Sequence, residues 1–212
     1  MNSDVAATII LTGDLDPERH RRYLNSRLLA VDTETRGLKT RRDRLCLVQM
    51  CNEEGVVTLV QVAGRTEAPR LKEVLEAATV EKIFHFARFD LAALKHWLGI
   101  QVAPAFCTRI ASRLVRTYTD RHGLKELVRE YLGIELDKEQ QSSDWAAAEL
   151  TRQQVAYAAA DVIHLIALKQ RLVTLLAREG RLALAEAAMT VLPVRVDLDL
   201  AGWEDEDLFA HN

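Results

Sequence analysis

Two carboxylates, Asp32 and Glu34, stand one residue apart at the end of the apolar stretch RLLAVDTETRGL. Residues 28–31 predict a buried strand, and side chains alternate across a strand, so both carboxylates face one side, roughly 7 Å apart. Neighbouring carboxylates repel each other and lose hydration when buried. A strand that ends in a polar turn would explain the pair without function. A divalent cation such as Mg²⁺ or Mn²⁺ would instead offset the repulsion, since hard oxygen ligands suit both ions.

Two later stretches carry further groups of this kind. Asp90 lies one turn into a predicted helix, directly after a strand, in KIFHFARFDL. A helix dipole favours a carboxylate there, and His85 could be an ordinary core histidine. Tyr157 and Asp161 are four residues apart in YAAADVIHL, so they share a helix face with Cβ atoms roughly 6 Å apart. They could be a hydrogen-bonded core pair, but a carboxylate in so apolar a helix needs a partner.

The four carboxylates and the phenol are more informative as a set. Four carboxylates balance the charge of two divalent cations, which would resolve the repulsion between Asp32 and Glu34. Two metal ions about 4 Å apart can activate a water and stabilise the leaving oxygen of a phosphodiester. Tyr157 would orient the attacking water or help to deprotonate it. The set therefore predicts a two-metal phosphodiester hydrolase.

The elements that must position these side chains alternate between strands and helices. Strands are predicted at residues 6–12, in the stretch from Leu28, and at residues 43–51, 56–62 and 81–86. Helices are predicted from Asp16-Pro17, from Ala68-Pro69 to about Ala78, from residue 87 to Gly99, near 107–116 and 122–132, from Thr151 to about Glu179, and at 181–191. The turn NEEG predicts a hairpin between the third and fourth strands. This order predicts an α/β fold with a mixed β-sheet flanked by helices, and a site where strands lead into helices.

Bulk properties limit the class of protein. A chain of 212 residues, 49% hydrophobic, suits one compact domain. The net charge of −3 argues against coating long nucleic acid by phosphate neutralisation, although a small anionic substrate is still possible. Several cations follow the first carboxylates and are ordinary for a solvated loop. No basic leader or membrane-spanning run is evident, so we expect no membrane association and a cytoplasmic protein. The three cysteines form no CxxC pair, which predicts reduced core thiols.

The motifs resemble those of the DEDD 3′–5′ exonucleases, a family with a ribonuclease H-like fold. VDTETRGL is similar to the first motif, which supplies Asp32 and Glu34, and HFARFD to the second, which supplies Asp90. YAAAD resembles the third motif in its tyrosine version (DEDDy), as in RNase D, with Tyr157 and Asp161. QSSDW resembles a segment that precedes the third motif in RNase D relatives. All five catalytic positions are filled in family order.

The short length, TYTDRHGLKEL, QQSSDWAA and the ending LAGWEDEDLFAHN are most similar to the nano-RNase C (NrnC) group of this family. The resemblance implies an exoribonuclease that cleaves short RNA, notably dinucleotides, to 5′-mononucleotides and assembles as a homo-octamer. It implies two divalent ions, Mg²⁺ or Mn²⁺, held by the four carboxylates. The substrate-binding residues that it implies are Thr33, Leu38, His85, Arg121, His122, Gln141 and Ser143. Among these, Leu38 would wedge against the bases, and Arg121 and His122 would grip the terminal phosphate.

The expected organisation is an exonuclease domain at residues 1–192 and a C-terminal tail at 193–212 that packs at a subunit interface. Two rival functions remain. A broader RNase D-like exonuclease would trim the 3′ ends of longer RNA or DNA. A catalytically dead domain would only bind nucleic acid or partners, but loss of activity usually shows as a replaced carboxylate, and none is replaced here.

Overall fold

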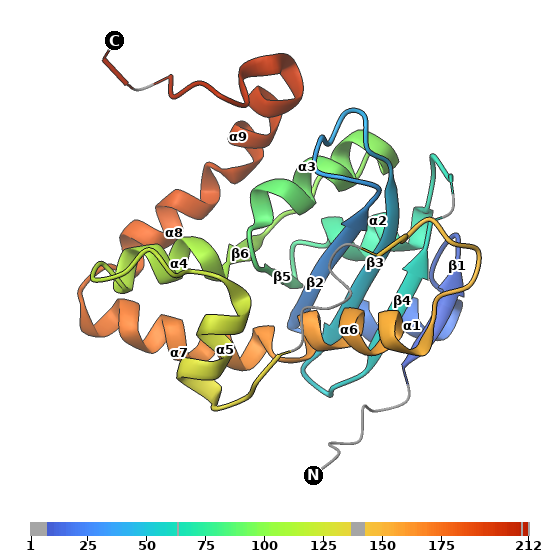
Figure 1. Cartoon of the computed structure of the whole chain (residues 1–212), viewed down its shortest axis with the longest axis horizontal. Coiled ribbons are helices and arrows are strands. Elements are labelled where there is room, and N and C mark those ends of the chain that lie inside the picture. The colour runs from blue at the N-terminus through green and yellow to red at the C-terminus, as the bar shows by residue number, and fades with distance from the viewer. Residues whose placement is uncertain (1–7, 63, 137–142, 209, 212) are drawn as a thin grey trace.

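The computed structural model describes residues 8–62, 64–136, 143–208 and 210–211. Its centre is a six-stranded sheet of order β1-β4-β3-β2-β5-β6 (Figure 1). The strands are β1 (Ile9–Thr12), β2 (Leu28–Thr35), β3 (Leu45–Asn52), β4 (Val57–Gln61), β5 (Glu81–Phe84) and β6 (Ala105–Cys107). β2, β3 and β4 pair antiparallel, whereas β1, β5 and β6 join as parallel strands. The predicted mixed sheet and the β3–β4 hairpin are confirmed.

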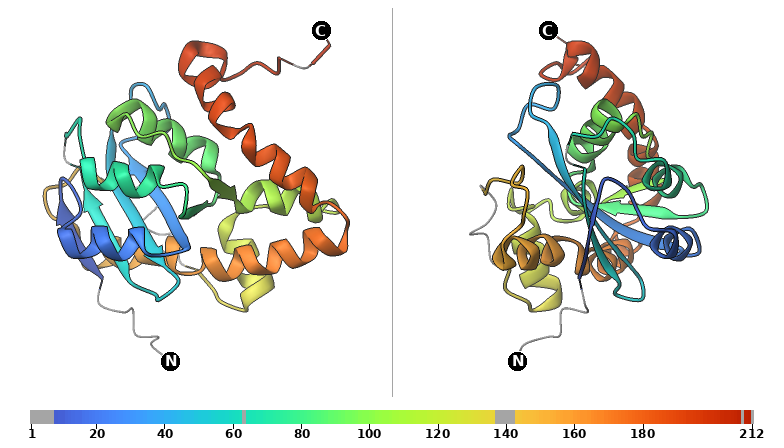
Figure 2. Two further views of the ribbon diagram at one scale, coloured as in Figure 1. Left: turned by 180° about the vertical axis from the view of Figure 1, so that it is seen from behind. Right: turned by 90° about the vertical axis from the view of Figure 1, so that its right-hand side faces the viewer.

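Helices cover both faces of this sheet. They are α1 (Pro17–Leu24), α2 (Pro69–Glu76), α3 (Ala87–Leu98), α4 (Thr108–Val115), α5 (Leu124–Leu132), α6 (Arg152–Ile163), α7 (Leu165–Arg178), α8 (Leu182–Thr190) and α9 (Leu192–Leu198). The two views of Figure 2 place α1, α2 and α3 on one face, and Figure 1 shows α6 across the other. α7 packs on β2 and β5 and also carries α4 and α5. None of the helices in the described ranges is long and apolar enough to cross a membrane.

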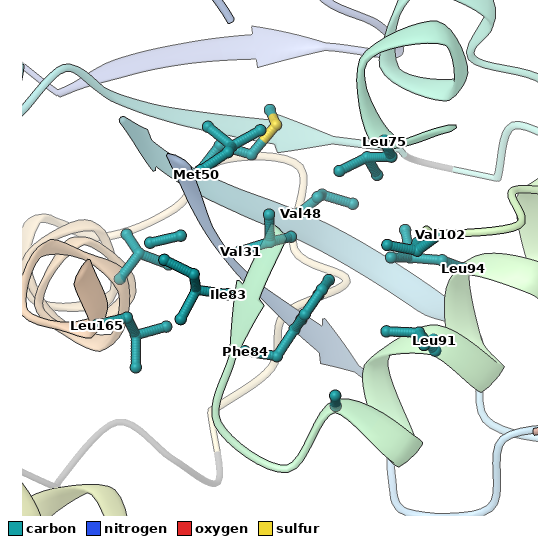
Figure 3. Close-up of a cluster of buried hydrophobic side chains, with 14 of the residues drawn as sticks. Val31, Val48, Met50, Leu75, Ile83, Phe84, Leu91, Leu94, Val102 and Leu165 are labelled. Atoms are coloured by element: carbon teal, nitrogen blue, oxygen red, sulfur yellow. The ribbon is translucent and has the colours of Figure 1, made fainter. Parts of the chain in front are cut away.

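The core lies between these layers and fixes the strands that carry the acidic residues. Every residue of β3 is buried. Figure 3 shows that Ile83 of β5 lies toward Leu165 of α7, whereas Phe84 lies toward Leu91 of α3. Adjacent side chains of this strand therefore pack against helices on opposite faces of the sheet, as the alternation of a strand requires. β2 and β5 are thus held from both faces close to the points where they end.

The prediction of one continuous helix from Thr151 to Glu179 is wrong. The structure has two helices that meet at His164. The predicted capping box is confirmed: the backbone N–H of Gln154 donates to Thr151 Oγ1, and the Thr151 N–H donates to Gln154 Oε1. α6 packs on β2, β3 and β4, whereas α7 packs on β2, β5, α4 and α5. No glycine or proline marks the break. The chain turns there because the two helices pack on different elements.

Two short elements, β6 and α9, were not predicted. β6 was missed because three residues are too few to show a period, and the strand forms through its pairing with β5. Helix formation does not stop at Leu192-Pro193, since Pro193 lies in the first turn of α9, where a missing N–H leaves no hydrogen bond unmade.

The beginning of the expected tail is therefore helical and anchored. α9 continues into a π-helical turn, η1 (Asp199–Trp203), and packs on α3. The carboxylate of Asp199 accepts hydrogen bonds from the guanidinium groups of Arg88 and Arg195. This region is an extension of the folded domain rather than a loose end.

The prediction that the three cysteines are reduced thiols in the core is confirmed. Cys46, Cys51 and Cys107 are all buried and free of disulfides. Burial raises the pKa of Cys51 to about 11, so this thiol stays protonated and unreactive.

Candidate active site

Three carboxylates gather at the end of β2. Asp32 and Glu34 project from the strand, and Asp161 projects from α6, which crosses that face of the sheet. One oxygen from each of the three lies within 4.8 Å of the others. Asp32 also accepts a hydrogen bond of 3.3 Å from the amide of Gln49 on the neighbouring strand. The donor set consists of hard oxygen ligands, which is the chemistry that Mg²⁺ and Mn²⁺ prefer.

Asp90 reaches the same region from α3, on the opposite face of the sheet. The residue is 3% exposed, and its carboxylate accepts a hydrogen bond of 2.7 Å from Thr33 Oγ1. Thr33 lies between Asp32 and Glu34, so alternation directs its side chain away from theirs and toward α3. Asp90 is not in the three-carboxylate cluster, although its charge acts on both Asp32 and Glu34. Thr33 thus orients a carboxylate.

Burial and mutual repulsion shift the titration of all these acids. Burial first, and then the charges of Asp90, Asp161 and Glu34, raise the pKa of Asp32 well above its ordinary value. Burial, with Asp161 and Asp90, raises the pKa of Glu34 to about 9. Burial raises the pKa of Asp90 to about 7, although the Thr33 hydroxyl opposes the shift. Such a cluster holds protons unless a cation replaces them, and the residues therefore fit a divalent ion.

Tyr157 lies one turn before Asp161 on α6. Burial, and then the charge of Asp161, raise the pKa of the phenol, so its hydroxyl stays protonated and can donate a hydrogen bond. The ring lies 5.9 Å from that of Trp145, which is buried. This packing fixes the direction in which the hydroxyl points. Tyr157 can therefore position an oxygen near the carboxylates.

A cavity of about 690 Å³ opens over these groups. Asp32, Glu34, Tyr157 and Asp161 line it together with polar, apolar and cationic side chains. Leu38, at 88% exposure, projects into this space from the loop after β2. The volume falls within the range of small-ligand sites. An acidic centre beside cationic and apolar walls suits an anionic ligand with flat apolar parts.

The sequence-predicted substrate residues divide into three groups. Thr33, Leu38, His85 and Ser143 line the cavity. Arg121 and His122 do not line it: His122 is buried, and its Nδ1 is 2.9 Å from Ser112 Oγ. Gln141 lies outside the described residues.

The cavity is also lined by cations and an aromatic residue to which the sequence analysis assigned no role in the site. Arg36, Arg109 and Lys125 line it, and they are the cationic side chains of the described residues at this surface. Arg109 follows β6, the strand that was itself missed. Lys125 lies three residues after His122, so the basic segment was found but not the residue that lines the cavity. Phe86 stood in the quoted motif HFARFD without a role.

Comparisons with known proteins agree with this geometry. Residues 8–177 match a protein-family model described as 3′–5′ exonuclease. The chain is 36% identical over 188 residues to ribonuclease D of Gluconacetobacter diazotrophicus, which covers 89% of this chain but 46% of that protein. The chain thus spans about half the length of this curated relative.

Two solved structures are similar over almost the whole chain. Brucella melitensis NrnC bound to pGG shares 47% identity at a TM-score of 0.91, covering 97% of this chain and 98% of the other. Brucella melitensis NrnC with bound Mg²⁺ shares 46% identity at a TM-score of 0.91, covering 97% and 99%.

The raised pKa values predict that the cation-free protein loses stability as pH rises. An acid with a raised folded-state pKa contributes stability that is fully present below its unfolded pKa and is lost as pH rises through the folded pKa. For Glu34 this window runs from 4.5 to about 9. With a chelator, the melting temperature should therefore fall from about pH 5 to about pH 9, and Mg²⁺ should restore it most at the alkaline end.

Glu34→Gln provides the control, since it removes one of the titrating acids and should flatten the profile in chelator. Parallel melting profiles with and without Mg²⁺ across this range would show that the carboxylates bind no cation.

Proposed function

The chain belongs to the RNase D-like family of 3′–5′ exonucleases, and on that premise we propose that it hydrolyses short oligoribonucleotides, above all dinucleotides, to 5′-mononucleotides. The observation that carries this proposal is the cluster of Asp32, Glu34 and Asp161, within 4.8 Å of one another on the wall of a cavity of about 690 Å³. A metal-binding acidic centre inside a small cavity suits a short phosphodiester better than a long chain.

The residues divide the work of an in-line hydrolysis. Asp32, Glu34, Asp90 and Asp161 would hold two divalent ions, Mg²⁺ or Mn²⁺, which supply a polarised water and charge stabilisation at the leaving oxygen. Burial raises the pKa of Tyr157, so its protonated hydroxyl can orient the attacking oxygen by donating a hydrogen bond. Thr33 holds Asp90 in place through its 2.7 Å hydrogen bond.

The remaining cavity residues would bind the substrate. Arg109 and Lys125 line the wall beside the acidic centre and can pair with a phosphate. Leu38 is exposed and apolar, which suits a wedge between two bases. His85 and Ser143 line the same space and complete the polar contacts.

Restriction to short RNA has support from the surface beyond Leu38. A second cavity of about 570 Å³ adjoins the first there, and it carries acids as well as cations. Arg41 Nη2 is 3.3 Å from a carboxylate oxygen of Glu204, and Arg88 is paired with Asp199. These two guanidinium groups already have carboxylate partners, which weakens the described part of this surface as a basic track for a long chain. The similar Brucella melitensis NrnC, bound to pGG, adds weight to a dinucleotide.

The alternative is a broader exonuclease that trims the 3′ ends of longer RNA or DNA. Similarity to ribonuclease D, matched over 46% of that relative, favours it.

Rates on labelled RNA of increasing length decide between the two. With Mg²⁺ present, we expect the initial rate to be highest on dimers, lower on heptamers and lowest on a tRNA-like 3′ end. Asp161→Asn keeps the size of the side chain but removes a charged ligand, so it should abolish hydrolysis of every substrate while the melting temperature is retained.

Equal rates across lengths would favour the broader exonuclease. Near-normal turnover by the Asp161→Asn variant would contradict the proposed mechanism.

We further propose that residues 1–192 form the exonuclease domain and that residues 193–212 take part in a subunit contact within a homo-oligomer, an octamer by resemblance. Support comes from exposed apolar side chains along α8, α9 and the residue between them. Leu184 on α8, Val191 between the two helices and Val194 on α9 are 58%, 49% and 57% exposed. The buried, free cysteines support a reducing compartment, for which we propose the cytoplasm.

Light scattering coupled to size exclusion tests the assembly. The mass should be a multiple of 23.9 kDa, and Val194→Glu should lower it because a charge would lie in the apolar contact. Lys72→Glu, on the distant α2, is the matched control and should leave the mass unchanged. A parent protein that runs as a monomer would contradict the proposal.

A further inference from the structure

Phe86 adopts a backbone conformation that its side chain disfavours. Its φ of 76° and ψ of 45° are left-handed, and it is the non-glycine residue with a positive φ among those the structure describes. This conformation is strained for a residue with a bulky side chain, whereas glycine and asparagine adopt it readily. Strained residues of this kind cluster where ligands bind.

The turn itself requires the conformation but not the ring. β5 ends at Phe84, and α3 begins at Ala87, so the chain changes from strand to helix within two residues. The N–H of Phe89 donates to the Phe86 carbonyl at 3.0 Å, which closes the first turn using backbone atoms alone. Asparagine would satisfy this turn with less strain. The aromatic side chain therefore needs another explanation.

Packing in the core does not provide it. Phe86 is 45% exposed, unlike Phe84 two residues earlier, which is fully buried. The Phe86 ring lines the active-site cavity and also the second cavity beyond Leu38. Leu38 lines both cavities as well. An exposed aromatic ring and an exposed aliphatic side chain thus stand together where the two cavities meet.

A cation supports the ring from within the site. The guanidinium carbon of Arg109 lies 5.1 Å from the centroid of the Phe86 ring, within the range of a cation–π contact. Arg109 also lines the active-site cavity. This contact restrains the ring in the position that the left-handed turn gives it. A restrained aromatic face loses little conformational entropy when a flat ligand stacks on it.

We propose that Phe86 is a specificity-determining residue whose ring stacks on a nucleobase of the substrate, with Arg109 bracing the ring. The inference rests on the proposed function, because it needs a nucleotide substrate in this cavity. Every nucleobase has a π face, so such a stack adds affinity without choosing among sequences. It would discriminate in favour of a ligand with a base at the junction of the two cavities.

The test pairs variants of Phe86 with dinucleotides that lack one base. Phe86→Asn suits the left-handed turn but has no ring, Phe86→Leu is apolar without a ring, and Phe86→Tyr keeps an aromatic face. The substrates are a purine dinucleotide and its two analogues in which one ribose carries no base, with KM and kcat measured for each in Mg²⁺. Thermal unfolding of each variant reports on the fold.

On the intact dinucleotide, Phe86→Asn and Phe86→Leu should raise KM about 10-fold or more, the size expected for the loss of one base–aromatic stack. Phe86→Tyr should restore KM to near the parental value. With one of the two abasic analogues, the parent and the Asn and Leu variants should have similar KM values, because the base that contacts the ring is gone.

A role in the turn alone gives the opposite pattern, with Phe86→Asn close to the parent on the intact dinucleotide. Effects of base removal that stay the same in the parent and both ringless variants, for both analogues, would also overturn the stack. A parent enzyme that hydrolyses none of the dinucleotides would instead refute the proposed function itself.

Discussion

The crowding of carboxylates at the end of β2 is the constraint on which the rest of the site depends. Asp32, Glu34 and Asp161 are held close by a strand and a helix that are packed on a common core, so they cannot move apart to relieve their repulsion. Their partial burial removes some of the water that would otherwise screen them. The protein therefore holds in its fold an electrostatic penalty that protons or divalent cations can relieve, and the raised pKa values express that penalty.

The layers of the fold explain how this arrangement is maintained. β2 is an interior strand, between β3 and β5, so its end is fixed by neighbours on both sides. α6 supplies Asp161 and Tyr157 from one face, and α3 supplies Asp90 from the other, with Thr33 as the link through the sheet. The turn before α3 also places the strained Phe86 beside the acidic centre. One strand end and one turn thus unite the carboxylates that we propose as metal ligands with the surface that we assign to a base.

Part of the site could be predicted because it depends on local periodicity. Strand alternation puts Asp32 and Glu34 together, and helix spacing puts Tyr157 beside Asp161. The Thr33–Asp90 bond could not be predicted in this way, since it joins residues 57 apart in the chain. Arg109 was missed because the three-residue β6 that precedes it forms only through pairing with β5. The division between α6 and α7 at His164 likewise reflects tertiary packing without a local signal.

The central claim is that the carboxylate cluster binds a pair of divalent cations. Anomalous diffraction from crystals grown with Mn²⁺ and an uncleavable dinucleotide tests it most directly. Our account predicts two manganese peaks about 4 Å apart, contacted by Asp32, Glu34, Asp90 and Asp161. An absence of peaks at these carboxylates, or manganese bound only elsewhere on the molecule, would contradict it.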